Sequence, residues 1–277
     1  MYSQLTSDRL SWFRTEHRFL NHTEIRSLDD YSKAISNRDA ASPVCMLGNG
    51  SNCLFARKTI STFLLKNKLP KDVRWTGEEE LWASSSVPLM SILKQCKKKS
   101  LDSFYYLSSV PATVGGAIAM NAGRGRHHNK TIFDFIHRVD VWTPDGEMSF
   151  SLDDIDRAYR HTVFLEHPDW FINGAAFKFP KFKHDEGNAI AQRVAFSQKV
   201  QDHSGPNCGS VFKLFHLGVL SRLQGVGFGG AHFSEKTQNW IINRSKSPRG
   251  ILWLIRFAKL FHLIRCKKCC LEIRVIK

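Results

Sequence analysis

The stretch at Pro111–Gly123 reads Pro-Ala-Thr-Val-Gly-Gly-Ala-Ile-Ala-Met-Asn-Ala-Gly. Glycine and alanine dominate it, and its apolar residues follow neither the helical nor the strand period. Chains use such a composition where the backbone must approach another group closely. A tight crossing of small residues would not need Thr113 or Asn121, so we interpret the stretch as a binding site for the edge of a flat ligand. The contacts that we expect are Pro111, Thr113, Gly115, Gly116, Asn121 and Gly123.

A second loop of small residues interrupts two short apolar runs. Val44–Leu47 ends at Gly48-Asn49-Gly50-Ser51-Asn52, and Cys53–Ala56 is apolar again. Backbone N–H groups in such a turn can converge on an anion such as a pyrophosphate, and an ordinary hairpin turn is the alternative. It is not a Rossmann fingerprint, because a strand pattern follows it. The candidate contacts are Leu47, Gly48, Asn49, Gly50, Ser51 and Asn52.

Two further segments carry reactive side chains. The run Asn207–Lys213 (Asn-Cys-Gly-Ser-Val-Phe-Lys) places the Ser210 hydroxyl at the start of an apolar strand, and Glu272 and Arg274 interrupt the apolar run at the end of the chain. Ser210 could instead bond its own turn, as such hydroxyls commonly do. Glu272 and Arg274 could be a surface ion pair worth less than about 1 kcal/mol.

The bulk composition places the chain among ordinary globular proteins. Of its 277 residues 42% are hydrophobic and 23% charged, and the net charge is +15. It has no apolar run of about 18 residues and no secretory signal after Met1, so we expect a cytoplasmic protein with no membrane partner. The basic residues are spread from Arg9 to Lys277, and the denser runs lie at apparent helix ends, so we expect no nucleic-acid partner.

The cysteine pattern indicates reduced thiols rather than a metal site. Seven cysteines are scattered along the chain, and only Cys266, Cys269 and Cys270 cluster, one helical turn after His262. Zinc needs four convergent ligands, whereas this segment reads as a helix that continues into a strand. We therefore predict no metal.

Helix and strand patterns alternate without a regular β-α-β rhythm, which predicts an α+β fold. The polar stretch after Pro180 is a candidate domain boundary. The expected helices lie within 20–37, where Ser27–Asp30 forms the cap, and at 87–98, 190–200 and 251–264. The expected strands lie at 44–47, 53–56, 139–143, 146–150, 170–179 and 271–276, the third and fourth forming a hairpin around Pro144-Asp145-Gly146.

Six segments, in this order, resemble the UDP-N-acetylenolpyruvoylglucosamine reductase (MurB-type) flavoproteins, from about Phe19 to Ile276. They are Leu47–Asn52, Val110–Gly123, Tyr159–Phe164, Gly209–Lys213, Gly229–Lys236 and Leu271–Ile276. The resemblance implies a two-subdomain FAD-binding fold of the vanillyl-alcohol-oxidase (PCMH) type over 1–182 and a smaller α+β substrate domain over 183–277. It also implies a monomer with non-covalent FAD, NADPH as the reductant, and a UDP-sugar substrate.

The resemblance further implies roles for three residues. The family's substrate is an enol ether conjugated to a carboxylate, and reduced flavin adds hydride to its outer carbon. Arg160 matches the arginine of the family's Tyr-Arg-x-Ser motif and would bind the carboxylate, where charge develops. Glu272 would lie against the same carboxylate, and Ser210 would protonate the inner carbon. Without the resemblance, Arg160 could be a surface arginine that follows Asp153, Asp154 and Asp156.

The chain also departs from the family pattern. Leu214-Phe215 follows Lys213 where the family usually has Asn-Pro, and the loop after Gly123 is Arg124-Gly125-Arg126-His127-His128. His127-His128 suggests a covalent flavin link or a metal, but the basic Arg124–Lys130 segment favours a solvated loop. Two alternatives stay open: a flavin reductase acting on another sugar or small molecule, and a non-catalytic member that binds an anionic partner.

Overall fold

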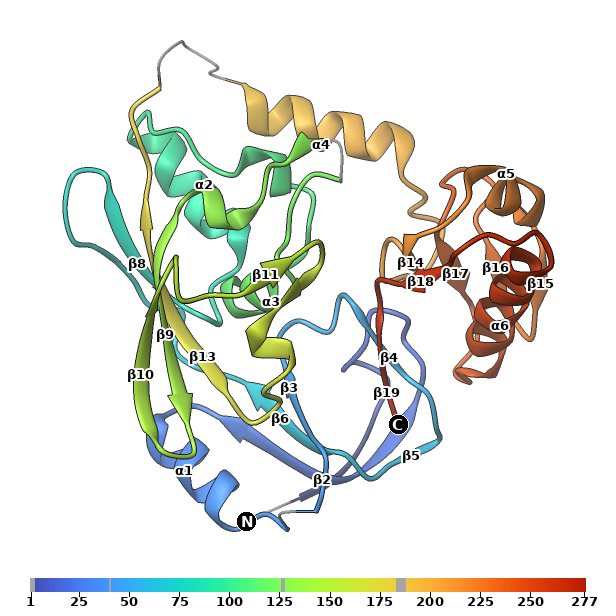
Figure 1. Cartoon of the computed structure of the whole chain (residues 1–277), viewed down its shortest axis with the longest axis horizontal. Coiled ribbons are helices and arrows are strands. Elements are labelled where there is room, and N and C mark those ends of the chain that lie inside the picture. Colours follow the sequence, from blue (N-terminus) through green and yellow to red (C-terminus); the bar gives the residue numbers. More distant parts are fainter. Residues whose placement is uncertain (1–2, 40, 126–127, 183–187) are drawn as a thin grey trace. The chain divides into compact units, whose positions relative to one another are not determined.

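The computed structural model describes residues 3–39, 41–125, 128–182 and 188–277, which form two compact units (Figure 1). The first unit contains the chain up to His22, Gly50–Thr62 and Gln198–Lys277, and the second contains Thr23–Asn49 and Phe63–Ser197. The chain passes between units inside strand β2 (His17–Ile25) and helix α4 (Ala189–Val200). This division groups residues that contact one another. The predicted boundary at 182 instead separates an FAD-binding domain from a substrate-binding domain, and it stays a prediction.

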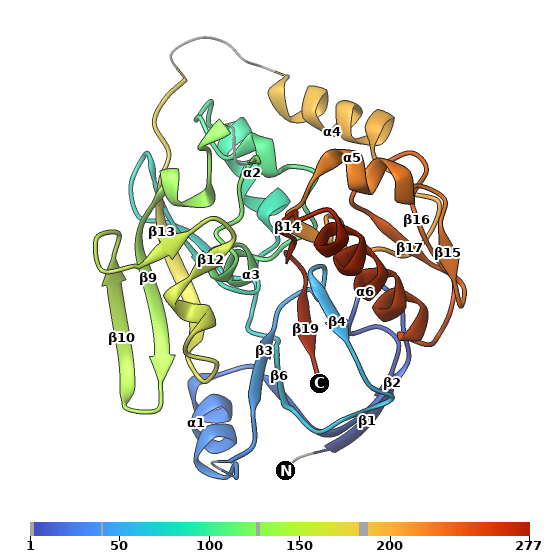
Figure 2. The same cartoon turned by 45° about the vertical axis from the view of Figure 1, so that its right-hand side comes forward.

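The second unit is built around an antiparallel sheet in the order β10-β9-β13-β8-β7. Its strands β10, β9 and β13 lie side by side in Figure 2. The edge strand β10 is largely exposed, whereas β13 is buried along most of its length, as expected of a central strand. The predicted hairpin is confirmed, because Thr143 pairs with Gly146. The strands are β7 (Val73–Trp75), β8 (Glu80–Ser84), β9 (Ile136–Thr143), β10 (Gly146–Ser151) and β13 (Phe171–Lys178).

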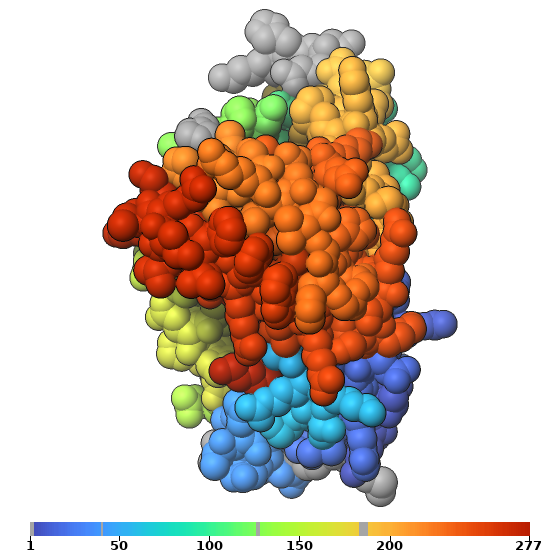
Figure 3. Space-filling view, turned by 90° about the vertical axis from the view of Figure 1, so that its right-hand side faces the viewer, coloured from blue at the N-terminus to red at the C-terminus, as the bar shows by residue number. Residues whose placement is uncertain are grey.

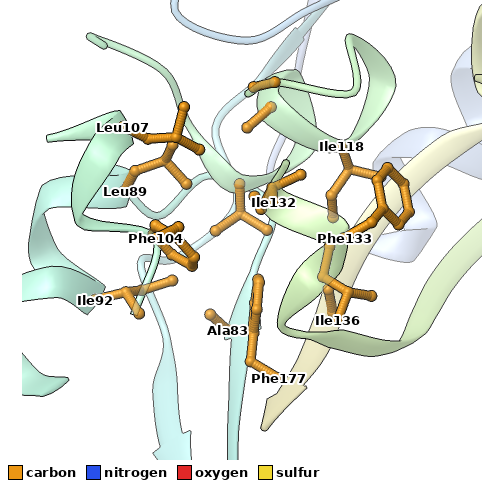
Figure 4. Close-up of a cluster of buried hydrophobic side chains, with 14 of the residues drawn as sticks. Ala83, Leu89, Ile92, Phe104, Leu107, Ile118, Ile132, Phe133, Ile136 and Phe177 are labelled. Atoms are coloured by element: carbon orange, nitrogen blue, oxygen red, sulfur yellow. The ribbon is translucent and has the colours of Figure 1, made fainter. Parts of the chain in front are cut away.

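Helices and short turns cover this sheet and close its core (Figure 4). Helix α2 (Leu89–Lys98) buries Leu89, Ile92, Leu93 and Cys96, the face that the sequence predicts. Helix α3 (Val114–Ala119) contacts β8 and β13. Short 3₁₀ turns lie at Tyr105–Leu107, Ile132–Asp134 and Val163–Leu165. The core therefore supports both ends of the Pro111–Gly123 stretch.

A smaller layer of the second unit holds the start of the 47–52 loop. Strand β3 (Val44–Leu47) pairs in parallel with β6 (Phe63–Asn67), and helix α1 (Leu28–Ser36) packs nearby through Tyr31 and Ala34. The predicted cap is confirmed, because the Ser27 hydroxyl accepts a hydrogen bond from Asp30 N at 3.2 Å. The ribbon β11 (Arg157–Ala158) and β12 (His161–Thr162) carries Arg160 in its turn.

The first unit joins the two ends of the chain. Strand β1 (Ser3–Ser7) pairs with β2, β2 pairs in parallel with β5 (Thr59–Ile60), and β4 (Cys53–Phe55) pairs in parallel with β19 (Arg274–Ile276). Residues 198–277, orange to red, make a continuous surface in Figure 3. The unit also contains α5 (Leu217–Leu220), a 3₁₀ turn (Ser221–Leu223), β15 (Gly227–Phe228), β16 (Ala231–Phe233), β17 (Ile241–Asn243) and α6 (Arg249–Ile264).

The structure divides the predicted final strand into two. Strand β18 (Cys270–Leu271) pairs antiparallel with β14 (Phe212–Leu214), whereas β19 pairs in parallel with β4. The chain changes partner at Glu272-Ile273, so one apolar run serves two sheets. The α+β class and the other predicted helices and strands are confirmed, with end shifts of a few residues. Within the described ranges, no helix has the length and apolar character required to cross a bilayer.

Candidate active site

The start of the 47–52 loop lies against the Pro111–Gly123 stretch in the second unit. Asn49 Nδ2 donates a hydrogen bond to Pro111 O at 2.7 Å. A Cβ on Gly48 would lie 2.9 Å from Thr113 Oγ1, so a larger residue would displace that hydroxyl. Two segments that the sequence analysis singled out separately are therefore neighbours.

The rest of the loop belongs to the first unit and is not a hairpin turn. Its flanking strands β3 and β4 pair with β6 and β19, not with each other. Gly50 has φ +69°, and a Cβ there would lie 2.1 Å from Leu10 O, so both its backbone and its surroundings require glycine. Asn52 Nδ2 donates to Glu272 O at 3.2 Å, and Asn52 O accepts from Arg274 N at 2.9 Å.

The Pro111–Gly123 stretch combines close packing with polar side-chain atoms that lack a hydrogen-bond partner in the described residues. A Cβ on Gly115 would lie 2.8 Å from Ser85 Cβ, and Gly115 N donates to Ser85 O at 2.9 Å. Thr113 occupies the N-cap of α3, yet its hydroxyl forms no capping hydrogen bond. A threonine at that position ordinarily accepts a backbone N–H, so this hydroxyl is available to another group.

The residues present fit a bound FAD. In the described part of the chain, six buried side-chain atoms have no hydrogen-bond partner, and Thr113 Oγ1 and Asn121 Oδ1 are two of them. The others are Ser108 Oγ, Asn173 Oδ1, Arg193 Nε and Ser197 Oγ. Leaving such an atom unpaired costs about 1–3 kcal/mol, so two of them on the one Pro111–Gly123 stretch indicate a ligand that satisfies them. All six belong to the second unit. Thr113 and Asn121 are residues that the sequence predicted as cofactor contacts.

Arg160 is tied to the same stretch. It lies in the turn between β11 and β12 with φ +57°, and its guanidinium donates to Asn121 O at 3.2 Å and Gly123 O at 2.8 Å. Asn121 Nδ2 in turn donates to Ala158 O at 2.9 Å. These bonds hold Arg160 on the predicted cofactor segment, unlike a solvated surface arginine.

Ser210 and Glu272 are brought together in the first unit. Glu272 N donates to the carbonyl oxygen of Val211, the residue after Ser210, at 2.8 Å. Asn239 fixes the backbone beyond Ser210, because its side chain accepts from Phe212 N at 2.9 Å and donates to Phe212 O at 2.8 Å. The Ser210 hydroxyl makes no hydrogen bond to its own turn in the described residues, so the alternative of a turn-stabilising hydroxyl is not observed.

The cysteine beside Ser210 is a structural thiol. Cys208 Sγ lies 3.5 Å from Cys53 O and 3.8 Å from Ser11 Oγ. Burial raises the pKa of this thiol to about 12, so it stays protonated at neutral pH. Its contacts anchor the Gly209–Ser210 turn to the start of β4.

Some residues of the site were missed by the sequence analysis. Lys66 Nζ donates to Gly48 O, which places a cation at the loop. Asn67 Nδ2 donates to Ser85 Oγ at 2.7 Å, and Ser85 N donates to Asn173 O at 2.8 Å. The run Ser84-Ser85-Ser86 after an apolar strand is a signal for Ser85, whereas Lys66 resembles any lysine on a strand. Of the Arg124–Lys130 loop, Arg126 and His127 lie outside the described residues.

Comparisons with known proteins first define the class. The family model described as "FAD binding domain" matches residues 24–150, which include Gly48, Thr113 and Asn121. The chain is therefore an FAD-binding protein.

The particular family follows from individual relatives. Over 245 residues the chain is 30% identical to UDP-N-acetylenolpyruvoylglucosamine reductase of Carboxydothermus hydrogenoformans, covering 83% of this chain and 78% of the relative. It is 28% identical to the protein of that name from Legionella pneumophila (strain Paris), over 87% and 80% of the two chains. The chain belongs to the UDP-N-acetylenolpyruvoylglucosamine reductase family.

A solved structure supports the fold. The crystal structure of UDP-N-acetylenolpyruvylglucosamine reductase (MurB) from Thermus caldophilus superposes with a TM-score of 0.81 at 19% identity, covering 100% of this chain and 99% of that one. This likeness bears out the expected two-subdomain FAD-binding architecture followed by a smaller α+β part.

Proposed function

We propose that this chain is an NADPH-dependent flavin reductase that converts the enolpyruvyl ether of UDP-N-acetylglucosamine enolpyruvate to UDP-N-acetylmuramate, a step of peptidoglycan precursor synthesis. The observation that carries the proposal is that the chain aligns with a reductase of that substrate over 78% of the relative's length, at 30% identity. The buried atoms Thr113 Oγ1 and Asn121 Oδ1, which have no hydrogen-bond partner in the described residues, independently support the binding of a flavin.

The cofactor would be held mainly by the second unit. Thr113 Oγ1 and Asn121 Oδ1 would offer it polar contacts, Gly48 leaves the Thr113 hydroxyl undisplaced, and Lys66 adds a positive charge beside the loop. The Gly50–Asn52 turn would bind the pyrophosphate through backbone N–H groups. The FAD held by these residues would supply hydride-transfer chemistry between NADPH and the substrate.

Arg160 would bind the substrate carboxylate. Its guanidinium is permanently charged and offers forked donors that match a carboxylate, and negative charge grows on this group as hydride adds to the conjugated double bond. The hydrogen bonds to Asn121 O and Gly123 O hold the side chain in one orientation, which lowers the cost of ordering it on binding.

Ser210 and Glu272 would complete the reduction. Ser210 would donate its hydroxyl proton to the inner carbon, since a serine hydroxyl stays protonated at neutral pH. Glu272 would lie against the substrate carboxylate and share a proton with that group. The hydrogen bond from Glu272 N to Val211 O holds the backbone of Glu272 close to the backbone that follows Ser210.

A second candidate is the same flavin chemistry on a different sugar or small molecule. Leu214 stands where the resemblance implies a substrate-binding Asn, and here it pairs with Cys270 in a strand. The protein would act in the cytoplasm as a monomer in either case.

Steady-state turnover tests the proposal. The FAD-saturated protein is incubated with NADPH and UDP-N-acetylglucosamine enolpyruvate, and mass spectrometry follows the product. We expect a product two hydrogens heavier than the substrate. If other enolpyruvyl ethers oxidised NADPH but this substrate did not, the second candidate would be favoured. The absence of turnover with any of these substrates, with FAD bound, would contradict both candidate functions.

A further inference from the structure

Helix α6 carries a series of stacked aromatic rings on its outer side. Phe228 of β15 stacks on Trp253 with ring centroids 4.6 Å apart, Trp253 on Phe257 at 4.8 Å, and Phe257 contacts Phe261 at 4.7 Å. Phe228 is 48% exposed and Trp253 38% exposed. The rings therefore form a continuous apolar strip that reaches solvent rather than a closed core.

The apolar strip continues to the end of the helix. Leu260 is 50% exposed, Leu263 71% and Ile264 69%. Exposed apolar side chains are ordinary when they occur singly, but a contiguous group on one helix marks an interaction surface. We call Phe228, Trp253, Phe257, Leu260, Phe261, Leu263 and Ile264 the α6 face.

The segment that carries most of the α6 face has basic side chains and no acidic ones. Residues 249–270 contain no Asp or Glu. Their basic side chains are all exposed: Arg249, Arg256, Lys259, Arg265, Lys267 and Lys268. A partner for this surface must therefore be apolar at its centre and anionic at its margin.

The opposite side of α6 is fixed in the first unit, which keeps the α6 face outward. Ile251, Leu254, Ala258 and His262 are buried, and the helix packs on β15, β16 and β17. His262 Nε2 accepts a hydrogen bond from His216 N at 3.0 Å, so Nδ1 carries the ring proton and donates it to Ala258 O at 2.7 Å. The 16 residues of the helix span about 24 Å, less than the roughly 30 Å of a bilayer core, so α6 would lie along a membrane surface.

We propose that the α6 face binds the surface of a bilayer that contains anionic lipids. Aromatic and aliphatic side chains with flanking Lys and Arg are the composition that helices use at this interface. A second copy of the chain fits poorly, because pairing through this face would bring like charges together. Nucleic acid fits poorly as well, because Leu260, Leu263 and Ile264 offer nothing to phosphates. This proposal differs from the expectation of no membrane partner, and it does not depend on the reductase chemistry.

Vesicle flotation of the full FAD-loaded chain tests the inference. One set of vesicles is phosphatidylcholine alone, and the other contains phosphatidylglycerol and phosphatidylcholine in equal parts. We expect the protein to float with the anionic vesicles, about tenfold or more better than with neutral ones, and less as salt rises. Equal binding to both sets, or binding to neither, would overturn the proposal.

Two variants separate the apolar and the charged contributions. L263S/I264S should lower anionic-vesicle binding by about tenfold or more, and R256Q/K259Q should do so while keeping the apolar residues. M148S, which changes a similarly exposed apolar residue on β10, is the matched control and should bind as the parent does. Unchanged binding in both double variants would refute the assignment to α6.

Two further measurements distinguish other partners. Gel filtration at rising concentration would reveal a dimer, and loss of that dimer in L263S/I264S would assign the face to a second copy instead. Tighter binding of a single-stranded oligonucleotide than of anionic vesicles would assign it to nucleic acid. Either result would overturn the membrane proposal.

Discussion

At the scale of single residues, the Ser210–Glu272 pair is the most informative feature of the first unit. Val211 O, directly after Ser210, accepts a hydrogen bond from Glu272 N and so links the backbone at the two positions. Both positions can be predicted from the sequence, because a small-residue turn and a lone acid in an apolar run are local signals. Their proximity cannot be predicted in this way, since they are far apart along the chain.

Replacing Ser210 should affect only the second half-reaction. In Ser210→Ala, NADPH should reduce the flavin at nearly the parent rate, whereas transfer to substrate should slow by about 10²–10⁴-fold because the proposed proton donor is lost. Stopped-flow absorbance under anaerobic conditions separates the two steps. Ser221→Ala, an exposed serine of the same unit, is the control, and equal slowing of both steps in Ser210→Ala would show that its role is misassigned.

Thr113 gives a test of the cofactor contact that does not need activity. Because its hydroxyl has no partner in the described chain, Thr113→Val should leave the stability of the apoprotein unchanged or slightly higher. The same variant should weaken FAD binding about fivefold, the value of one hydrogen bond of about 1 kcal/mol. Fluorescence titration with FAD and thermal unfolding measure the two quantities.

The matched control for Thr113 is Thr162. Its hydroxyl is also buried but donates to Ala119 O at 2.9 Å. Thr162→Val should therefore lower the free energy of unfolding by about 1 kcal/mol. If Thr113→Val destabilised the apoprotein as much as Thr162→Val does, the Thr113 hydroxyl would have a structural partner and not a ligand.

At the scale of elements, the pairing of β2 with β5 contains a pH-sensitive contact. His17 is buried between Arg57 O, 2.6 Å from Nδ1, and Thr15 Oγ1, 2.7 Å from Nε2. Burial lowers the pKa of His17 below its ordinary value of 6.5, so the folded state favours the neutral ring. The unfolded chain binds the proton more readily, and this contribution to stability is therefore complete above about pH 6.5 and lost as pH falls below it.

This linkage predicts a smaller pH dependence in a His17 variant. The free energy of unfolding of the FAD-saturated protein should fall between about pH 7 and pH 5, and His17→Gln should reduce that fall. Urea unfolding at several pH values measures it. His137→Gln, on the exposed side of β9, should leave the slope as in the parent. An identical slope in His17→Gln would mean that His17 does not contribute.

The elements also show where local sequence patterns stop being sufficient. The run Leu271–Ile276 reads as one strand, but Glu272-Ile273 separates an antiparallel pairing with β14 from a parallel pairing with β4. Likewise, the pattern around Gly48–Asn52 indicated strand, loop and strand but left open whether the strands form a hairpin. Both outcomes depend on distant strands, β6 and β14, which no local window contains.

At the scale of the whole molecule, the fold class and the cofactor followed from six ordered motifs. The family model and the relatives agree with that reading, and the Thermus caldophilus structure matches the entire fold. What the motifs could not reveal was chemistry outside the family pattern. The contact of Lys66 with Gly48 and the exposed α6 face follow from the three-dimensional structure, not from a sequence motif.

The decisive experiment is an anaerobic absorption spectrum of the FAD-saturated protein, followed through two additions. NADPH should bleach the oxidised flavin band, and UDP-N-acetylglucosamine enolpyruvate should then restore it, one flavin per substrate molecule, because the proposed reaction moves hydride from nicotinamide to flavin to substrate. A protein that retains no FAD, or a reduced flavin that this substrate leaves bleached, would contradict the assignment.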